Sequence, residues 1–367
     1  MPADAPKQQQ PANPGKSQSW TVGELLRWTT ERFAKAGIDE ARVDAEHLLA
    51  MALGCKRFDL YVQHSRLLDE ETRAPFREYV RRRLSREPVA YIRGTRGFHA
   101  LDLDLAVDRR VLIPRPETEH LVDWLLEELP RAPQPEQFED PPSGAELDAA
   151  ISERVEAEAA AAHLDPAEAG DAGSTDAEEG PDAGAPACAG DAEPIYVVDV
   201  GTGSGAIALA VKRARPDVEV LAIERSADAL AVAAANIESC GLEVHLRRGD
   251  LLDDTRPPRG GFHAVAANLP YIPSADLAGL QPEVRDFEPM SALDGGRDGL
   301  DLIRRLLDRC AQAGVLAAGG RVYLEIGIHQ APAVIDELRR RGFVDVAARR
   351  DYGGVERVIA ATAPPRA

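Results

Sequence analysis

The stretch Ile-Tyr-Val-Val-Asp-Val-Gly-Thr-Gly-Ser-Gly, residues 195–205, decides the fold expected of this chain. Its apolar first half predicts a buried strand, and Gly201, Gly203 and Gly205 predict a tight turn into a helix that begins near Ala206. Such a turn lets backbone N–H groups at the start of the helix approach a ligand closely. Strand and helix patterns alternate regularly after it, which predicts an α/β fold with a parallel, doubly wound, Rossmann-like sheet.

Two further positions at strand ends predict a nucleoside site beside this turn, which also contains Thr202 and Ser204. The second strand, 218–223, ends in Glu224, and a carboxylate there can accept both hydroxyls of a ribose. The third strand, near 244–246, leads to Asp250 and Leu251, which could meet an adenine edge. The turn also fits the dinucleotide fingerprint, so a nicotinamide dehydrogenase stays open on this evidence alone.

The fourth strand, 262–267, ends in Asn268-Leu269-Pro270-Tyr271, and this tetrapeptide favours methyl transfer to a planar nitrogen. The lone pair of such a nitrogen is drawn into a π system, so it attacks a sulfonium methyl poorly. The side-chain oxygen of Asn268 and a backbone carbonyl can accept its two N–H groups and orient the lone pair. Pro270 stiffens the turn, and Tyr271 offers a flat face. The alternative is an ordinary strand exit, where these residue types are common.

Length and charge indicate several parts in the chain of 367 residues. Residues 133–193 carry 17 acidic residues and one basic residue, so this segment holds −16 of the formal charge of −19 and leaves −3 for the rest. The segment has too little apolar surface to order itself, and we expect a disordered insertion. Residues 1–18 form a second loose tail without the features of a secretory signal.

No apolar stretch reaches the roughly 18 residues that a membrane span needs. The four cysteines lie far apart without CxxC pairing, which fits a reducing cytoplasm, and neither they nor the histidines have metal-ligand spacing. Between residues 19 and 93 the pattern predicts a small helical bundle. Its helices begin at a capping box of Thr21 with Glu24, at Asp39 and at Asp69, and the second ends at Gly54. The alternation from Phe98 to 107 predicts a hairpin, and 112–119 reads as the capped start of a further helix.

Taken together, these segments resemble the bacterial glutamine methyltransferases that modify peptide-chain release factors, the PrmC or HemK family. The similarity covers residues 20–129 and 195–361, and the matching segments are 88–92, 113–119, 199–205, 285–289, 292–300 and 350–353. The resemblance implies a class I methyltransferase domain at 194–363, a substrate-docking bundle at 19–93 and a linker with the first catalytic helix at 94–132. It implies a cytoplasmic, monomeric enzyme that binds S-adenosylmethionine, with no metal, no membrane and no direct need for nucleic acid. Its partners are class 1 peptide chain release factors, in which it methylates the glutamine of the Gly-Gly-Gln motif.

The resemblance also implies roles for single residues. Gly201 to Gly205 hold the methionine part of the cofactor, Glu224 the ribose, and Asp250 with Leu251 the adenine. Asn268 and the carbonyl of Leu269 accept the two amide N–H groups, while Pro270 and Tyr271 shape the slot. Phe98 has two possible interpretations: its side chain packs at the edge of the cofactor, or it packs in the core of the hairpin.

The family tetrapeptide is Asn-Pro-Pro-Tyr, and this chain has Leu269 at its second position. The resulting sequence Asn-Leu-Pro-Tyr is the form associated with ribosomal RNA adenine methyltransferases. Leucine keeps the carbonyl but not the fixed φ of proline, so we expect a modest effect. An RNA adenine methyltransferase therefore stays as an alternative, as does a decayed ribosome-associated binding module. The bundle precedes the catalytic part here, and that order favours glutamine.

Overall fold

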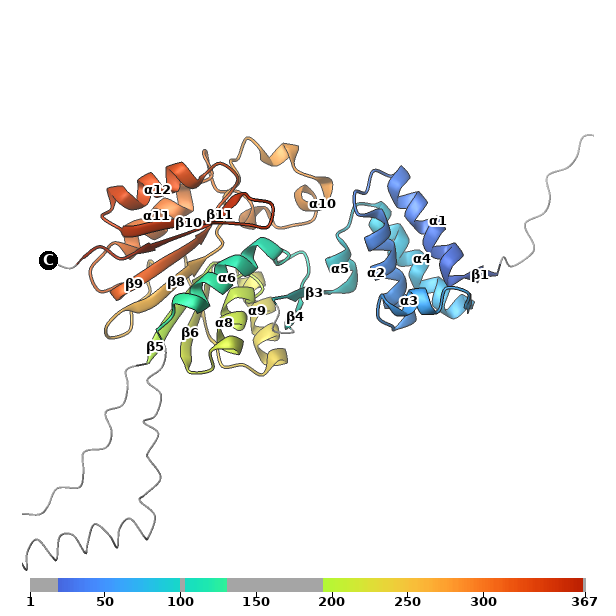
Figure 1. Ribbon diagram of the computed structural model, residues 1–367, viewed down its shortest axis with the longest axis horizontal. Coiled ribbons are helices and arrows are strands. Elements are labelled where there is room, and N and C mark those ends of the chain that lie inside the picture. Colours follow the sequence, from blue (N-terminus) through green and yellow to red (C-terminus); the bar gives the residue numbers. More distant parts are fainter. Residues whose placement is uncertain (1–18, 100–102, 131–193, 366–367) are drawn as a thin grey trace, which may run out of the picture. The chain divides into compact units, whose positions relative to one another are not determined.

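The computed structural model describes residues 19–99, 103–130 and 194–365 (Figure 1). The expected tail at 1–18 and the expected insertion at 133–193 lie outside the described residues.

The first described segment is a helical bundle, as predicted. Thr21 and Glu24 form the expected capping box, in which the Thr21 Oγ1 accepts from the Glu24 N–H at 3.2 Å and the Glu24 carboxylate accepts from the Thr21 N–H at 2.9 Å. Asp69 caps a later helix through the Thr72 N–H at 2.9 Å. The elements are β1 (Trp20–Thr21), α1 (Val22–Lys35), α2 (Ala41–Leu53), α3 (Asp59–Val62), β2 (Leu67–Leu68), α4 (Glu70–Leu84) and α5 (Val89–Arg93).

The start of α2 corrects one prediction. Asp39 was expected to open this helix, but the N-cap is Glu40, whose side chain makes no capping hydrogen bond. Its backbone, with φ −93° and ψ 36°, lies outside the extended conformation that aims an N-cap side chain at the next amides. The other end is as predicted, because Gly54 ends α2 in the left-handed conformation with φ 61°. The bundle is held by a core in which Phe33, Leu48 and Phe76 are buried.

A two-stranded hairpin follows, formed by β3 (Thr95–Phe98) and β4 (Leu103–Ala106). Asn236 of helix α9 (Ala227–Cys240) fixes this hairpin. Its Oδ1 accepts from the Ala106 N–H at 2.8 Å, and its Nδ2 donates to the Ala106 carbonyl at 3.0 Å. Phe98 is buried in the hairpin and does not line the main pocket, so its core-packing reading is confirmed.

The following described residues contain a seven-stranded sheet in the order β10-β11-β9-β8-β5-β6-β7. The sheet is mixed, which corrects the prediction of a wholly parallel one: β11 runs antiparallel to both β9 and β10. A short loop joins β10 to β11, and such a connection can only reverse the chain. The strands are β5 (Ile195–Val200), β6 (Val218–Glu224), β7 (His245–Arg248), β8 (Phe262–Ala267), β9 (Leu316–Glu325), β10 (Val344–Arg350) and β11 (Glu356–Thr362).

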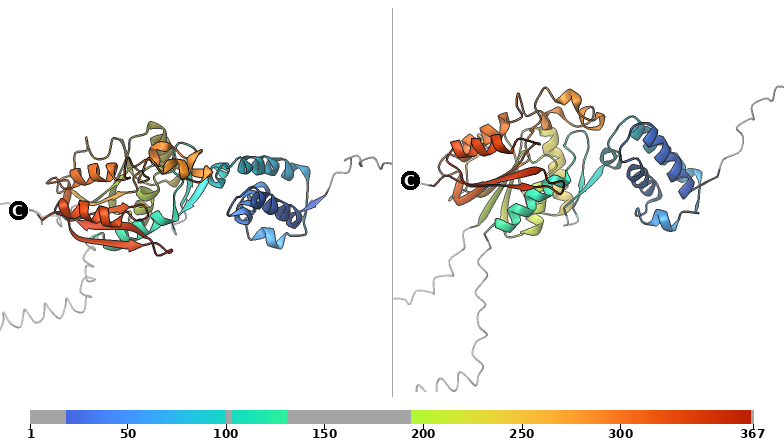
Figure 2. Two further views of the ribbon diagram at one scale, coloured as in Figure 1. Left: turned by 90° about the horizontal axis from the view of Figure 1, so that it is seen from above. Right: turned by 45° about the horizontal axis from the view of Figure 1, so that its top comes forward.

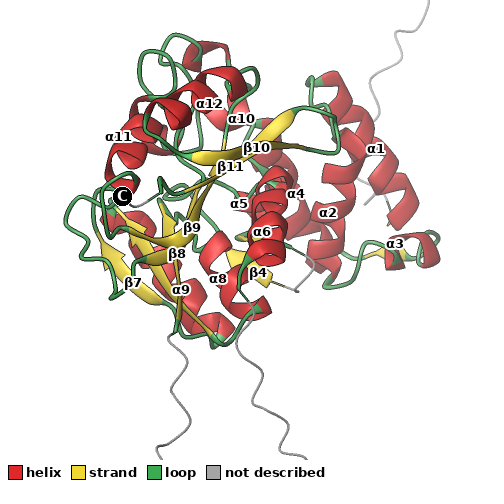
Figure 3. Cartoon of the chain, turned by 60° about the vertical axis from the view of Figure 1, so that its left-hand side comes forward, coloured by secondary structure: helices red, strands yellow, loops and turns green. Residues whose placement is uncertain are grey.

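Helices cover both faces of this sheet, as a doubly wound fold requires (Figures 1 and 3). Helices α6 (Pro116–Glu128), α8 (Ala206–Ala214) and α9 lie on one face, whereas α11 (Asp301–Cys310) and α12 (Ala331–Arg340) lie on the other. Figure 2 shows the same layers from two other directions. Between β8 and α11 the chain forms the short helices η1 (Leu277–Gly279), α10 (Pro282–Arg285) and η2 (Met290–Ala292).

The core of the sheet is formed by residues such as Val198, Val265 and Val322, which are completely buried. Each large apolar side chain buried in this way contributes about 1.5–3 kcal/mol relative to exposure, so the sheet is a firm platform for its loops. Within the described ranges, no helix has the length and apolarity to cross a membrane. Cys55, Cys240 and Cys310 are free thiols there.

Candidate active site

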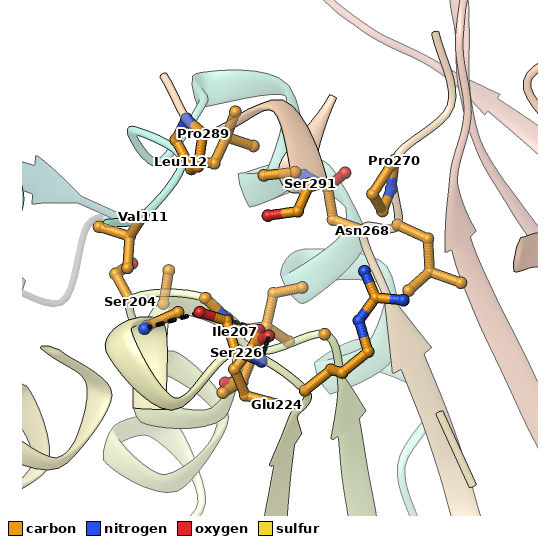
Figure 4. Close-up of a pocket in the computed structure, with 18 of the residues that line it drawn as sticks. Val111, Leu112, Ser204, Ile207, Glu224, Ser226, Asn268, Pro270, Pro289 and Ser291 are labelled. Atoms are coloured by element: carbon orange, nitrogen blue, oxygen red, sulfur yellow. Dashed lines mark hydrogen bonds between the residues drawn. The ribbon is translucent and has the colours of Figure 1, made fainter. Parts of the chain in front are cut away.

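A pocket of about 1050 Å³, part of it open to solvent, lies at the carboxyl ends of β5, β6 and β8 (Figure 4). Open α/β sheets bind their ligands at this edge. The lining includes every residue expected to hold cofactor or substrate except Gly205 and Tyr271. The predicted residues that line it are Gly201, Thr202, Gly203, Ser204, Glu224, Asp250, Leu251, Asn268, Leu269 and Pro270.

The glycine turn has a left-handed backbone conformation, which glycine adopts with little strain. Gly201, Gly203 and Gly205 have φ of 76°, 57° and 88°. The N–H groups of Gly201 and Thr202 both donate to the Ile223 carbonyl, at 2.9 and 3.0 Å, which anchors the turn to β6. A Cβ on Gly203 would meet no described atom nearer than the Gly201 carbonyl at 4.0 Å. The space beside Gly203 is therefore open for a ligand.

Asp199 lies beneath this turn and was not among the predicted site residues. Its Oδ2 accepts from the Thr202 hydroxyl at 2.6 Å and from the Ala208 N–H at 3.1 Å. Burial raises the pKa of this carboxyl to about 6, although the two hydrogen bonds lower the pKa. Its Oδ1 is buried and has no hydrogen-bond partner among the described residues.

Glu224 ends β6 and faces the same pocket (Figure 4). Its Oε2 accepts from the Gly203 N–H at 3.1 Å, and its Oε1 accepts from the Ser226 N–H at 2.8 Å. Each carboxylate oxygen has a second lone pair, so the group can still accept from two hydroxyls. The hydrogen bonds from the Gly203 and Ser226 N–H groups hold the Glu224 carboxylate in a fixed orientation toward the pocket.

Asp250 and Leu251 line the pocket after β7. Leu251 is buried and has φ 52°, an unusual backbone for leucine. One carboxylate oxygen of Asp250 is bound by Arg305 of α11 at 3.0 Å, and Arg305 also binds Asp253 at 2.7 Å. Asp250 is thereby fixed at the pocket edge with its other oxygen available.

The tetrapeptide after β8 lies against the glycine turn. Leu269 is buried, and its Cδ2 approaches to 3.0 Å of where a Cβ on Gly201 would be. Leu269 therefore packs directly on the glycine turn. Asn268 and Pro270 face the pocket from the same loop (Figure 4).

Tyr271 is placed differently from the other three residues. It is absent from the pocket lining, and its hydroxyl donates to Glu325 Oε1 at a long 3.5 Å. Its carbonyl accepts from Gln330 Nε2 at 2.8 Å. The tyrosine thus braces the loop from behind, and the structure does not bring its ring to the pocket surface.

Thr118 and Glu325 are site residues that sequence reasoning missed. Thr118, in the first turn of α6, lines the pocket, donates its hydroxyl to Glu325 Oε2 at 2.5 Å and accepts from Asn268 Nδ2 at 3.0 Å. Glu325 ends β9 and is 1% exposed. Burial raises its pKa to about 7, although the Thr118 hydroxyl favours the charged form. The signal for Glu325 was a single acid at the end of an apolar strand, at the same edge as Glu224 and Asn268.

The stretch 112–119 was expected to do no more than start a helix, and the structure corrects this. Leu112, Pro114 and Thr118 line the pocket. Arg115 forms an ion pair at 2.5 Å with Glu288, whose side chain is 1% exposed. Burial raises the pKa of Glu288, and the Arg115 charge opposes that rise. The pair joins the start of α6 to the segment that carries Pro289 and Ser291, which close the pocket on the other side (Figure 4).

Across the described ranges, no group of three or more histidine, cysteine, aspartate or glutamate side chains could hold a metal ion. The polar groups of the pocket are backbone amides, two carboxylates, one carboxamide, five hydroxyl groups and two arginines, which suit an organic ligand with hydroxyl, amino and carboxylate groups.

Comparison with known proteins agrees with this geometry. Residues 24–94 match the PrmC N-terminal domain, and residues 197–287 match a methyltransferase domain. The first match spans the helical bundle, and the second spans the glycine turn, Glu224, Asp250 and the Asn268 loop.

Several relatives carry the name release factor glutamine methyltransferase, among them the following three. The protein of Geobacter sulfurreducens is 36% identical over 94% of this chain and 97% of its own length. The protein of Rhodopirellula baltica is 33% identical over 93% of this chain and 95% of its own length. The protein of Gloeobacter violaceus is 35% identical over 90% of this chain and 94% of its own length. Both domains and the loops that form the pocket lie within these alignments, and so the chain belongs to the release factor glutamine methyltransferase family.

Proposed function

We propose that this chain uses S-adenosylmethionine to methylate the side-chain amide nitrogen of the glutamine in the Gly-Gly-Gln motif of class 1 peptide chain release factors. Family membership supports the reaction class. The observation that carries the proposal is the position of Asn268 and Leu269 in the same pocket as the glycine turn and Glu224.

S-adenosylmethionine, when bound, supplies a methyl group made electrophilic by a positively charged sulfur. The residues present fit such a cofactor. The turn of Gly201 to Gly205 offers backbone N–H groups and open space beside Gly203, which suits the methionine part. Glu224 has free lone pairs for the ribose hydroxyls, and Asp250 with Leu251 offers an edge for the adenine.

Asn268 and Leu269 orient the substrate amide. Asn268 donates Nδ2 to Thr118, and its Oδ1 makes no hydrogen bond to any described residue. That oxygen and the Leu269 carbonyl can accept the two N–H groups of a glutamine carboxamide. Both acceptors hold the nitrogen with its lone pair directed at the cofactor side of the pocket. They also stabilise the positive charge that develops on nitrogen during transfer.

The direct test uses radiolabelled S-adenosylmethionine with a release factor purified from cells that lack its methyltransferase. Mass spectrometry should find one methyl group on the glutamine of the motif and none on a release factor with alanine at that position. Asn268→Ala should abolish most transfer and leave cofactor affinity intact. Label on adenine of undermethylated ribosomal RNA would favour the RNA methyltransferase alternative, and no label on either substrate would favour a binding module.

We also propose that the bundle docks the release factor. Its support is a group of exposed apolar side chains around α3 and β2, among them Phe58, Val62 and Leu67 at 73%, 72% and 65% exposure. Exposed apolar groups of this kind mark interaction surfaces. Phe58→Ser with Val62→Ser should raise the KM for the whole release factor and leave turnover of a short peptide with the motif unchanged. An unchanged KM for the whole factor would place docking elsewhere.

We propose in addition that the enzyme acts in the cytoplasm as a monomer and needs no nucleic acid. The support for a monomer is that one chain supplies residues on all sides of the pocket. Light scattering at assay concentration tests the oligomeric state. Nuclease treatment that leaves the rate unchanged tests independence from RNA.

A further inference from the structure

A chain of hydrogen bonds links Asn268 to two residues that sequence patterns did not single out. Asn268 follows β8, Thr118 lies in the first turn of α6, and Glu325 ends β9, so three separate elements converge here. Asn268 Nδ2 donates to Thr118 Oγ1 at 3.0 Å, and the Thr118 hydroxyl donates to Glu325 Oε2 at 2.5 Å. Thr118 is 4% exposed and Glu325 is 1% exposed, so water does not replace these bonds.

The number of protons shared among Asn268, Thr118 and Glu325 decides which end of the Asn268 amide faces Thr118. An ionised carboxylate only accepts hydrogen bonds, and a threonine hydroxyl has one hydrogen to donate. While Glu325 is ionised, the Thr118 hydrogen must point at it, so the lone pairs of Thr118 remain for Asn268. Only the Nδ2 end of Asn268 can donate to them. The Oδ1 end is then the one presented to a ligand.

We propose that Thr118 and Glu325 are positioning residues that keep the Asn268 amide oxygen turned toward the substrate. This inference rests on the proposed function, in which that oxygen accepts an N–H group of the glutamine. It adds to that function a reason why Asn268 presents Oδ1 to the substrate, although its Oδ1 and Nδ2 ends have nearly the same shape. A carboxamide rotated by half a turn would put two acceptors, its own Oδ1 and the Thr118 Oγ1, against each other and would lose the hydrogen bond.

Protonation of Glu325 reverses the order of donors. A neutral carboxyl can donate to Thr118, whose hydrogen can then turn to Asn268 Oδ1, and the amide nitrogen faces the substrate instead. The groups that act on Glu325 are Glu117, which favours the neutral form, Arg357 and Arg115, which favour the charged form, and the Tyr271 hydroxyl at 3.5 Å. Desolvation outweighs the two arginines and raises the pKa to about 7. Turnover should therefore be full above this pH and decline below it.

The experiment compares Thr118→Val, Thr118→Ser and Glu325→Gln in the full chain. Thr118→Val keeps the shape and removes the hydroxyl, and kcat should fall about three- to tenfold, the effect of one lost hydrogen bond, while S-adenosylmethionine affinity is unchanged. Thr118→Ser should restore kcat. Glu325→Gln cannot ionise, so it should lose the decline of kcat below neutral pH. Thr29→Val is the matched control, because Thr29 is also buried but its hydroxyl has no partner among the described residues.

A second measurement does not depend on turnover. In protein labelled with nitrogen-15, the side-chain NH2 resonance of Asn268 should shift with pH as Glu325 titrates, and it should not do so in Glu325→Gln. Wild-type kcat in Thr118→Val, or an Asn268 resonance that is indifferent to both changes, would overturn the relay while leaving the proposed function intact. Failure of the wild type to methylate any release factor would count against the proposed function, and the resonance would still decide the relay.

Discussion

Replacement of Gly203 by alanine separates the role of the glycine turn in binding from its role in folding. Gly203 has φ 57° and lines the pocket, and a Cβ there would meet no described atom within 4 Å other than the Gly201 carbonyl at its limit. Gly241, which ends α9, is a matched control: its φ is 62° and a Cβ there would meet nothing within 4 Å. It lies at the opposite end of α9 from Ser226, which lines the pocket.

Both substitutions impose the same backbone strain. An alanine in the left-handed region costs about 1–2 kcal/mol, partly offset by the lower entropy of the unfolded chain. Each variant should therefore lose about 1 kcal/mol of unfolding free energy, which lowers Tm by roughly 2–4 °C. Only Gly203→Ala adds a methyl group to the space in the pocket where we expect the cofactor to bind. A steric conflict of that kind costs about 1–3 kcal/mol, and so the Kd of Gly203→Ala for S-adenosylmethionine should rise roughly 5- to 150-fold.

Isothermal titration calorimetry gives the cofactor affinity, and differential scanning fluorimetry without ligand gives Tm. The expected pattern is an equal small loss of Tm in both variants and a loss of affinity in Gly203→Ala alone. If Gly203→Ala binds the cofactor as tightly as the wild type, the turn is not the binding cradle. If Gly241→Ala also loses affinity, the effect comes from general destabilisation.

Three further predictions concern the surroundings of the site and the bundle. Arg115→Met leaves Glu288 buried without its partner and should cost about 3 kcal/mol in urea unfolding, whereas adding Glu288→Leu should recover most of it. Leu269→Pro keeps the carbonyl and should change kcat by no more than about fivefold, but Leu269→Ala should cost about 2–5 kcal/mol of stability. Burial opposes ionisation of Glu46, yet hydrogen bonds from a tyrosine and two arginines lower its pKa to about 2. This depressed pKa stabilises the fold above about pH 4.5 and the gain is lost toward pH 2, so Glu46→Gln should weaken the acid dependence of unfolding monitored by circular dichroism.

The sequence predicted the pocket because its main parts obey a local rule. Strand, glycine turn and helix follow one another at 195–206, and Glu224 and Asn268 each end an apolar strand. Strands that run parallel bring their carboxyl ends to one edge, so these residues meet without any knowledge of their contacts. The bundle was predictable for a similar reason, since Thr21 and Asp69 cap their helices through neighbours three residues away.

The parts that could not be predicted depend on contacts between distant segments. Thr118 and Asn268 are 150 residues apart, and nothing in the pattern around Thr118 distinguishes it from an ordinary residue of a first helical turn. The antiparallel course of β11 follows from a short loop rather than from its composition. The N-cap of α2 differed from the prediction by one residue, because backbone geometry rather than residue type decides it.

Helix α6 and strand β5 flank the connection of 63 residues, 131–193, and the directions of these two elements decide where the connection leaves the domain. Helix α6 begins at Pro116, holds Thr118 at the pocket in its first turn and runs away from it, and β5 starts at Ile195, at the amino edge of the sheet. Both points of attachment are thus at the end of the domain remote from the chemistry. A change in the length of this connection, or a reporter protein grafted into it, is therefore expected to leave turnover unchanged.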